Sequence, residues 1–120
     1  MIQIEQADFV AVPSRDRRRS RRFYGATLGL RPDEHEEDEF WAGATCLAIW
    51  EPREEFQPSV YSPVALRVAD VAEARADLES QGVEFVGETR DTGACQMAIF
   101  VDPDGNHLML HRRYAKHGET

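Results

Sequence analysis

Hydrophobic and polar residues alternate in short runs along the first half of the chain, and glycine or proline separates these runs. Alternation predicts a strand over residues 3–13, which ends at Pro13. Asp16 is placed to cap a helix that extends to about Leu28 and ends at Gly29. Three further short strands are predicted over residues 30–35, 39–43 and 45–51.

The second half repeats this order of elements. Alternation over residues 64–68 predicts a half-buried strand. Asp70 and Glu73 form an Asp variant of the capping box at the start of a helix that ends near Gly82. Three strands are then predicted over residues 83–87, 96–102 and 106–112.

The matching order of elements indicates a duplicated unit. Adding 54 to the residue number takes Val10 to Val64 and Asp16 to Asp70, although side-chain identity between the halves is low. We predict one domain over residues 1–114. Its parts are a first module at about 3–51, a linker at about 52–62, a second module at about 63–112 and a frayed tail at 115–120.

Composition narrows the possible functions of this 120-residue chain. Lys plus Arg is 14 and Asp plus Glu is 22, a net charge of −8, which disfavours binding to nucleic acid or anionic membranes. Neither a membrane-spanning run nor a signal peptide is present, so we expect an unexported, cytoplasmic protein. Cys46 and Cys95 fit neither a disulfide scaffold nor a zinc motif, and we interpret them as reduced thiols.

Several short motifs in this order resemble the vicinal oxygen chelate superfamily of glyoxalases, extradiol dioxygenases, fosfomycin-resistance enzymes and bleomycin-binding proteins. The motifs are Phe23-Tyr24, Leu28-Gly29-Leu30, Ala-Leu-Arg-Val-Ala-Asp at 65–70, Gln81-Gly82-Val83 and Phe-Val-Asp-Pro-Asp-Gly-Asn at 100–106. The resemblance covers about residues 7–112. It implies an α+β fold, in which two βαβββ modules form a cup from curled mixed sheets with the helices outside.

Members of this superfamily usually hold a divalent metal ion in the cup. The resemblance places the ligand positions at Phe9, Ala48, Pro63 and Met109. Phe, Ala and Pro have no donor atom, and the Met thioether suits copper rather than zinc, magnesium or manganese. We therefore expect no metal and no cofactor.

Strand alternation predicts which side chains line the cup beside those four positions. The candidate ligand-binding residues are Phe9, Ala48, Trp50, Pro63, Arg67, Met97, Ile99, His107, Met109 and His111. This lining is mostly apolar and suits a small aromatic or anionic molecule, with loops 52–62 and 88–95 shaping the pocket. The same apolar side chains could instead fill the cup as core, and Arg67 could pair with a nearby acid.

The two histidines allow a catalytic interpretation. His107 and His111 lie on one face with Met109 between them, about 13 Å apart along the strand, too far to share one ion. Either could act as a general base, but no partner residue is identifiable.

Two charge clusters lie in the first half. Arginines crowd the start of the first helix, where the helix dipole disfavours cations, and an acidic run follows. These residues are Arg15, Arg17, Arg18, Arg19, Arg21 and Arg22, and Glu34, Glu36, Glu37, Asp38 and Glu39. The preferred interpretation is two solvated surfaces. The alternative is that they meet as complementary patches, within the chain or across a dimer.

We expect a metal-independent protein of the glyoxalase and bleomycin-resistance type that binds a small organic molecule in an apolar cup. A homodimer is expected, with modules paired within one chain or exchanged between two. One alternative is an enzyme of the lyase or dioxygenase type with an atypical or metal-free site. The other is a dimeric scaffold without a ligand.

Overall fold

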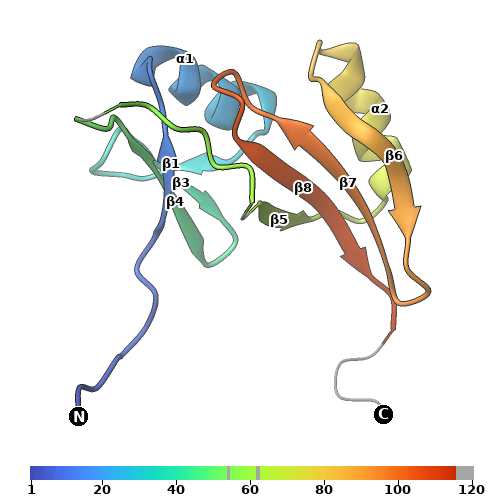
Figure 1. Cartoon of the computed structure of the whole chain (residues 1–120), viewed down its shortest axis with the longest axis horizontal. Coiled ribbons are helices and arrows are strands. Elements are labelled where there is room, and N and C mark those ends of the chain that lie inside the picture. Colours follow the sequence, from blue (N-terminus) through green and yellow to red (C-terminus); the bar gives the residue numbers. More distant parts are fainter. Residues whose placement is uncertain (54, 62, 116–120) are drawn as a thin grey trace. The chain divides into compact units, whose positions relative to one another are not determined.

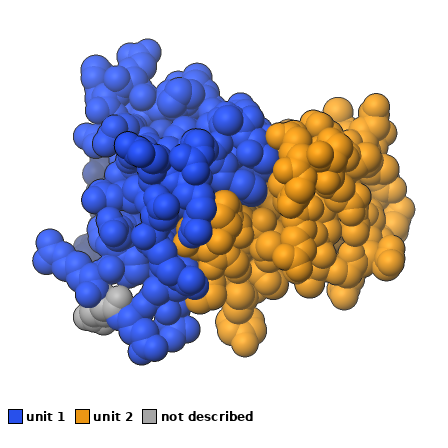
Figure 2. All heavy atoms as spheres, turned by 90° about the horizontal axis from the view of Figure 1, so that it is seen from above, with its two compact units in different colours: residues 1–57 blue, residues 58–120 orange. Residues whose placement is uncertain are grey.

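The computed structural model describes residues 1–53, 55–61 and 63–115. The chain divides into two compact units, residues 1–57 and 58–120, which Figure 2 shows in different colours. The division falls inside the predicted linker at 52–62. The single domain over residues 1–114 and the cup formed by both modules stay predictions.

Unit 1 contains one mixed sheet with one helical segment. Its elements are β1 (Val10–Pro13), α1 (Arg17–Arg22), the π-helix η1 (Phe23–Thr27), β2 (Arg31–Pro32), β3 (Glu39–Ala42) and β4 (Thr45–Trp50). The strand order is β1-β4-β3-β2, with β1 parallel to β4 and the other pairs antiparallel (Figure 1).

Unit 2 repeats this topology. Its elements are β5 (Val64–Arg67), α2 (Val71–Ser80), β6 (Phe85–Asp91), β7 (Cys95–Val101) and β8 (His107–Arg113). The order β5-β8-β7-β6, with β5 parallel to β8, matches unit 1 strand for strand. The α+β class and the repeat of the module are confirmed. In the described part of the chain, no helix is long and apolar enough to cross a membrane.

Both helices begin at the predicted aspartates. Asp16 Oδ1 accepts a hydrogen bond of 3.1 Å from the Arg19 amide, and Asp70 Oδ1 accepts one of 3.0 Å from the Glu73 amide. Each carboxylate satisfies a backbone donor that the first turn leaves free. This first helix was predicted to extend to about Leu28. It is α-helical only to Arg22 and continues as a π-helix, in which the Leu28 amide donates to the Phe23 carbonyl five residues back.

Three strand boundaries differ from the prediction. The strand predicted at 3–13 is confined to Val10–Pro13, because the parallel pairing with β4 begins only at Val10, opposite Leu47. The strand predicted at 30–35 is only two residues long, since Asp33 accepts from the amides of His35 and Glu36 and turns the chain. The strand predicted at 83–87 starts at Phe85 and continues to Asp91 through a register shift.

Each sheet buries one face beneath its own helix. In unit 1, Val12, Phe40, Leu47 and Ile49 are buried with Tyr24 of η1. In unit 2, α2 lies against one side of the sheet (Figure 1). The buried side chains of this unit are Val71, Leu78, Ala98, Phe100, Leu108 and Leu110. The alternate residues of each strand project to the opposite face, which we call the helix-free face.

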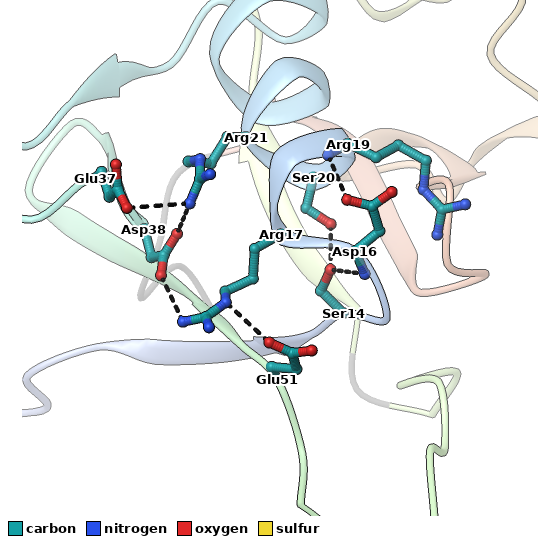
Figure 3. A network of polar contacts seen from close by, with 9 residues as sticks. All are labelled: Ser14, Asp16, Arg17, Arg19, Ser20, Arg21, Glu37, Asp38 and Glu51. Atoms are coloured by element: carbon teal, nitrogen blue, oxygen red, sulfur yellow. Dashed lines mark hydrogen bonds and ion pairs between the residues drawn. The ribbon is translucent and has the colours of Figure 1, made fainter.

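Ion pairs explain how an arginine-rich sequence forms α1 (Figure 3). Arg21 contacts Asp38 at 2.6 Å and Glu37 at 3.5 Å, and Arg17 contacts Asp38 at 3.3 Å and Glu51 at 3.0 Å. The hydrogen bond that Arg21 donates to Asp38 is the main cause of a raised pKa at Arg21. The interpretation of two solvated surfaces is wrong for these residues, because the acids lie within reach of the helix and offset its unfavourable charge.

The Asp-Pro-Asp-Gly segment at 102–105 forms a turn that carries a buried polar network. Asp102 Oδ1 accepts from the Asp104 and Asn106 amides at 2.9 Å each, and its other oxygen accepts from Asn106 Nδ2 at 2.7 Å. Asn106 Oδ1 accepts from the Ser59 amide at 2.8 Å, and the His107 amide donates to the Ser59 carbonyl. The turn therefore holds Ser59, in the segment that leads into β5, by hydrogen bonds.

The linker is also fastened to unit 1. The Arg15 guanidinium lies 4.1 Å from the centre of the Phe56 ring, within the range of a cation–π contact. Phe56 is thereby held by unit 1 and Ser59 by unit 2.

Replacing Asn106 with alanine tests the buried network. Asn106→Ala removes the hydrogen bonds to Asp102 and to the Ser59 amide, and we expect the free energy of unfolding to fall by about 2–4 kcal/mol. Urea unfolding followed by circular dichroism measures this change. The exposed Gln96→Ala serves as the control, with an expected change below about 0.5 kcal/mol. Equal stability of the two variants would contradict the role given to this network.

Candidate functional site

The helix-free face of unit 1 presents an aromatic pair. Phe9 and Trp50 stack with ring centroids 6.4 Å apart and an interplanar angle of 17°, and they are 47% and 55% exposed. Ala48 lies between Ala11 and Glu39 in the strand register and is buried. Two of the three predicted residues of this module therefore offer area to a ligand, and Ala48 forms part of the sheet beneath them.

Sequence reasoning missed other side chains on this face. Trp41 and Glu39 alternate with the buried Phe40 on β3 and share the face with Ala48. Trp41 Nε1 donates to Asp33 Oδ1 at 2.9 Å, and the Arg31 guanidinium lies 5.7 Å from the Trp41 ring. The Trp41 hydrogen bond, followed by those from the His35 and Glu36 amides, lowers the pKa of Asp33. Alternation along β3 was the signal that could have found them.

Cys46 lies on the same face but is a poor nucleophile. Its Sγ contacts Glu39 Oε1 at 3.6 Å, and the side chain is buried. Burial first, and the Glu39 carboxylate second, raise the pKa of the Cys46 thiol to about 11. At neutral pH the thiolate that nucleophilic chemistry needs is therefore nearly absent.

The helix-free face of unit 2 gathers the predicted residues of the second module. Two rows cross its four strands: Ala65, Met109, Ile99 and Val86 form the first, and Arg67, His111, Met97 and Arg90 form the second. His107 precedes Met109 by two residues, and Pro63 precedes Ala65 by two. Most of these side chains are half-buried, and Arg67 and Arg90 are exposed.

Arg90 was missed because residues 88–95 were predicted to be a loop. β6 continues to Asp91, and a register shift between Val86 and Arg90 restores the pairing with β7. Gly87 at the shift has a φ of 74°, which favours glycine. The glycine was visible in the sequence, but the resumption of the strand depends on β7.

The four positions at which the resemblance places metal ligands do not fit a divalent ion. Phe9 and Ala48 lie on the helix-free face of unit 1, and Pro63 and Met109 lie on that of unit 2. Met109 alone has a donor atom, and thioether sulfur is a weak ligand for zinc, magnesium or manganese. Among the described residues, no three His, Cys, Asp or Glu side chains form a group that could hold a metal.

A shallow open hollow in unit 1 adjoins the aromatic pair at Trp50. It is lined by Arg17, Ile49, Trp50, Glu51, Pro52, Arg53 and Glu55. Most of these residues are charged, and Trp50 is the only candidate ligand-binding residue among them. The hollow therefore shares Trp50 with the apolar site that the sequence predicts, but its lining is more strongly charged.

The duplicated topology, with one helix-free face on each sheet, agrees with the comparisons with known proteins. Residues 6–110 match the family model of the Glyoxalase/Bleomycin resistance protein/Dioxygenase superfamily. The chain belongs to this superfamily. The resemblance inferred from the short motifs is thereby confirmed. No curated protein sequence matches the chain significantly.

Solved structures of this superfamily share the fold. TnmS3, an antibiotic binding protein from Streptomyces sp. CB03234, is 26% identical, with a TM-score of 0.75 and coverage of 94% of this chain and 99% of that chain. A glyoxalase-family protein from Bacillus anthracis is 23% identical, with a TM-score of 0.75 and coverage of 94% and 98%. A superfamily member from Sphaerobacter thermophilus is 21% identical, with a TM-score of 0.75 and coverage of 90% and 97%.

The reactivity of Cys46 tests the environment on the helix-free face of unit 1. In a Cys95→Ser background, we expect alkylation by iodoacetamide to be slow at neutral pH and to accelerate towards pH 11, following the raised pKa. Glu39→Gln removes a negative charge and should lower the pKa of Cys46. The value should stay above that of an exposed thiol, because burial is the larger cause.

The exposed Glu36→Gln is the matched control, and we expect it to leave the alkylation profile unchanged. Mass spectrometry of the alkylated protein measures the rate at each pH. A midpoint at the ordinary thiol pKa of about 8.5 would contradict the placement of Cys46.

Proposed function

We propose that this protein binds a small organic molecule on its helix-free faces without a metal ion. The observation that carries the proposal is the combination of apolar side chains at the metal-ligand positions of the superfamily with exposed aromatic and half-buried thioether side chains on the same faces. The proposed ligand-binding residues are Phe9, Ala48, Trp50, Pro63, Arg67, Met97, Ile99, His107, Met109 and His111.

The chemistry of these faces favours sequestration over catalysis. Holding a ligand requires contact area and a few polar groups, whereas superfamily reactions that depend on a metal require donor atoms that Phe9, Ala48 and Pro63 lack. The remaining nucleophile on the face of unit 1, Cys46, is held as a neutral thiol. The stacked rings of Phe9 and Trp50 offer a flat apolar surface suited to an aromatic ligand.

The likeness to TnmS3 supports the same proposal. That protein binds an antibiotic, has the same fold over nearly its whole length and is 26% identical to this chain. Binding of an antibiotic is therefore a function that a protein of this fold can perform.

A thermal shift screen with small aromatic and anionic compounds tests ligand binding. A compound at 100 times its Kd adds about 2.7 kcal/mol of stability to the folded state, which corresponds to a rise in Tm of roughly 10 °C. We expect Trp50→Ala and Met109→Ala to weaken the Kd of a hit by at least about tenfold. Tyr114→Ala, an exposed aromatic on the opposite face of the unit 2 sheet, should leave it unchanged.

Metal addition in the thermal shift assay, and a turnover assay with any hit, distinguish the proposed binding protein from an enzyme or a scaffold. After dialysis against a chelator, adding zinc, manganese, nickel or magnesium ions should leave both Tm and Kd unchanged. Stoichiometric metal with a rise in Tm would support a metal enzyme, and turnover of a hit that is lost in His107→Gln or His111→Gln would support a metal-free one. A panel without any stabilising compound would favour a scaffold without a ligand.

The proposal extends to a homodimer. Phe9, Trp50 and Val86 expose large fractions of their side chains, and soluble chains commonly cover such surface by association. We expect analytical ultracentrifugation to give twice the chain mass. High salt should not dissociate the dimer, because Arg17 and Arg21 form their ion pairs within one unit. A monomer, or a dimer that high salt dissociates, would contradict this arrangement.

A further inference from the structure

Two arginines and a histidine lie in one row across the sheet of unit 2. The register pairs Arg67 with His111, His111 with Met97, and Met97 with Arg90. Directly paired residues of neighbouring strands project to the same side of a sheet. This side is the helix-free face, because Phe85 and Thr89 of β6 contact Arg75 of α2 on the other side.

Both ends of the row are cationic, and neither has an acidic partner in the part of the chain that the structure describes. Within residues 1–53, 55–61 and 63–115, the side chains of Arg67, His111 and Arg90 form no hydrogen bond, ion pair or ring contact. Arg17, Arg21 and Arg75, by contrast, each form an ion pair with a carboxylate. The row is therefore free to bind an anion.

The strands of the same sheet contain few carboxylates that could neutralise the positive charge of the row. β5, β7 and β8 contain no Asp or Glu. In β6, Asp91 accepts a hydrogen bond from Tyr114, and Glu88, within the register shift, makes no ion pair with Arg90. The positive charge of the row is thus balanced by no carboxylate on its own sheet.

An apolar row lies directly beside the cationic one. Ala65, Met109, Ile99 and Val86 occupy the neighbouring register positions on the same face. Val86 is 46% exposed, and Met109 and Ile99 are half-buried, so the row retains accessible apolar surface. A molecule with an apolar body and an anionic end would match both rows at once.

We infer that the row of Arg67, His111 and Arg90 binds the carboxylate of a small organic anion, whose apolar part lies along Met109 and Ile99. The inference rests on the proposed function and names the class of ligand. Arg67 and Arg90 are about 14 Å apart at the backbone, and their long side chains can approach a carboxylate held over His111 and Met97. The guanidinium fork is suited to bidentate binding of such a group.

Matched pairs of carboxylates and neutral amides test this inference. We propose titration calorimetry with benzoate and benzamide, phenylacetate and phenylacetamide, and 1-naphthoate and 1-naphthamide. The carboxylate of at least one pair should bind at least about tenfold more tightly than its amide. Arg67→Gln and Arg90→Gln should each remove most of this preference, because they should weaken binding of the carboxylate much more than binding of the amide.

Arg112→Gln is the matched control, because Arg112 neighbours His111 on β8 but pairs with Gln96 on the opposite face. It should retain the preference of the wild-type protein. Equal binding of carboxylate and amide would overturn the inference while the proposed binding function stands. Absence of binding by every pair would overturn both. Loss of stability in Arg67→Gln without any carboxylate preference would also overturn it, because it would show that Arg67 pairs with a protein carboxylate.

Discussion

A single helix covers only one face of a four-stranded sheet, and this constraint governs both halves of the molecule. η1 and α2 bury the alternate residues that include Phe40, Leu47, Phe100 and Leu108. Every strand must also place side chains on the other face, where its own module has no helix to cover them. The chemical character of those side chains therefore decides what each module can bind, and the buried faces decide only that it folds.

The two helix-free faces carry different chemistry on the same topology. Unit 1 presents the Phe9 and Trp50 rings with carboxylates at Asp33 and Glu39, whereas unit 2 presents thioethers, histidines and arginines. In unit 1, Asp38, Glu37 and Glu51 are engaged by the arginines of α1. The net charge of the chain therefore says little about its local electrostatics. Carboxylates pair with the arginines of α1, whereas the row of Arg67, His111 and Arg90 on the sheet of unit 2 has no carboxylate paired with it among the described residues.

Local signals predicted much of this structure from the sequence. The caps at Asp16 and Asp70 and the glycine ends depend only on neighbouring residues, and alternation placed the β4, β5, β7 and β8 side chains on their faces. Features that depend on distant partners were missed. β1 is short because its pairing with β4 begins only at Val10, and β6 is long because β7 pairs with it beyond the Gly87 irregularity. Arg90 was assigned to a loop for this reason. Glu39 was assigned to a solvated run although alternation along β3 places it on the helix-free face, so each face was predicted only in part.

The contacts that hold the linker leave only a short free segment between the two modules. The Arg15 contact holds Phe56 to the first half of the chain, and the Asn106 turn holds Ser59 to the second. Only Gln57 and Pro58 remain between these two anchors, and the proline ring restricts the backbone rotation of one of them. The connection between the modules is therefore a hinge of two residues rather than a long flexible linker. The torsions of two residues would decide whether a module docks within its own chain or is donated to a neighbouring one.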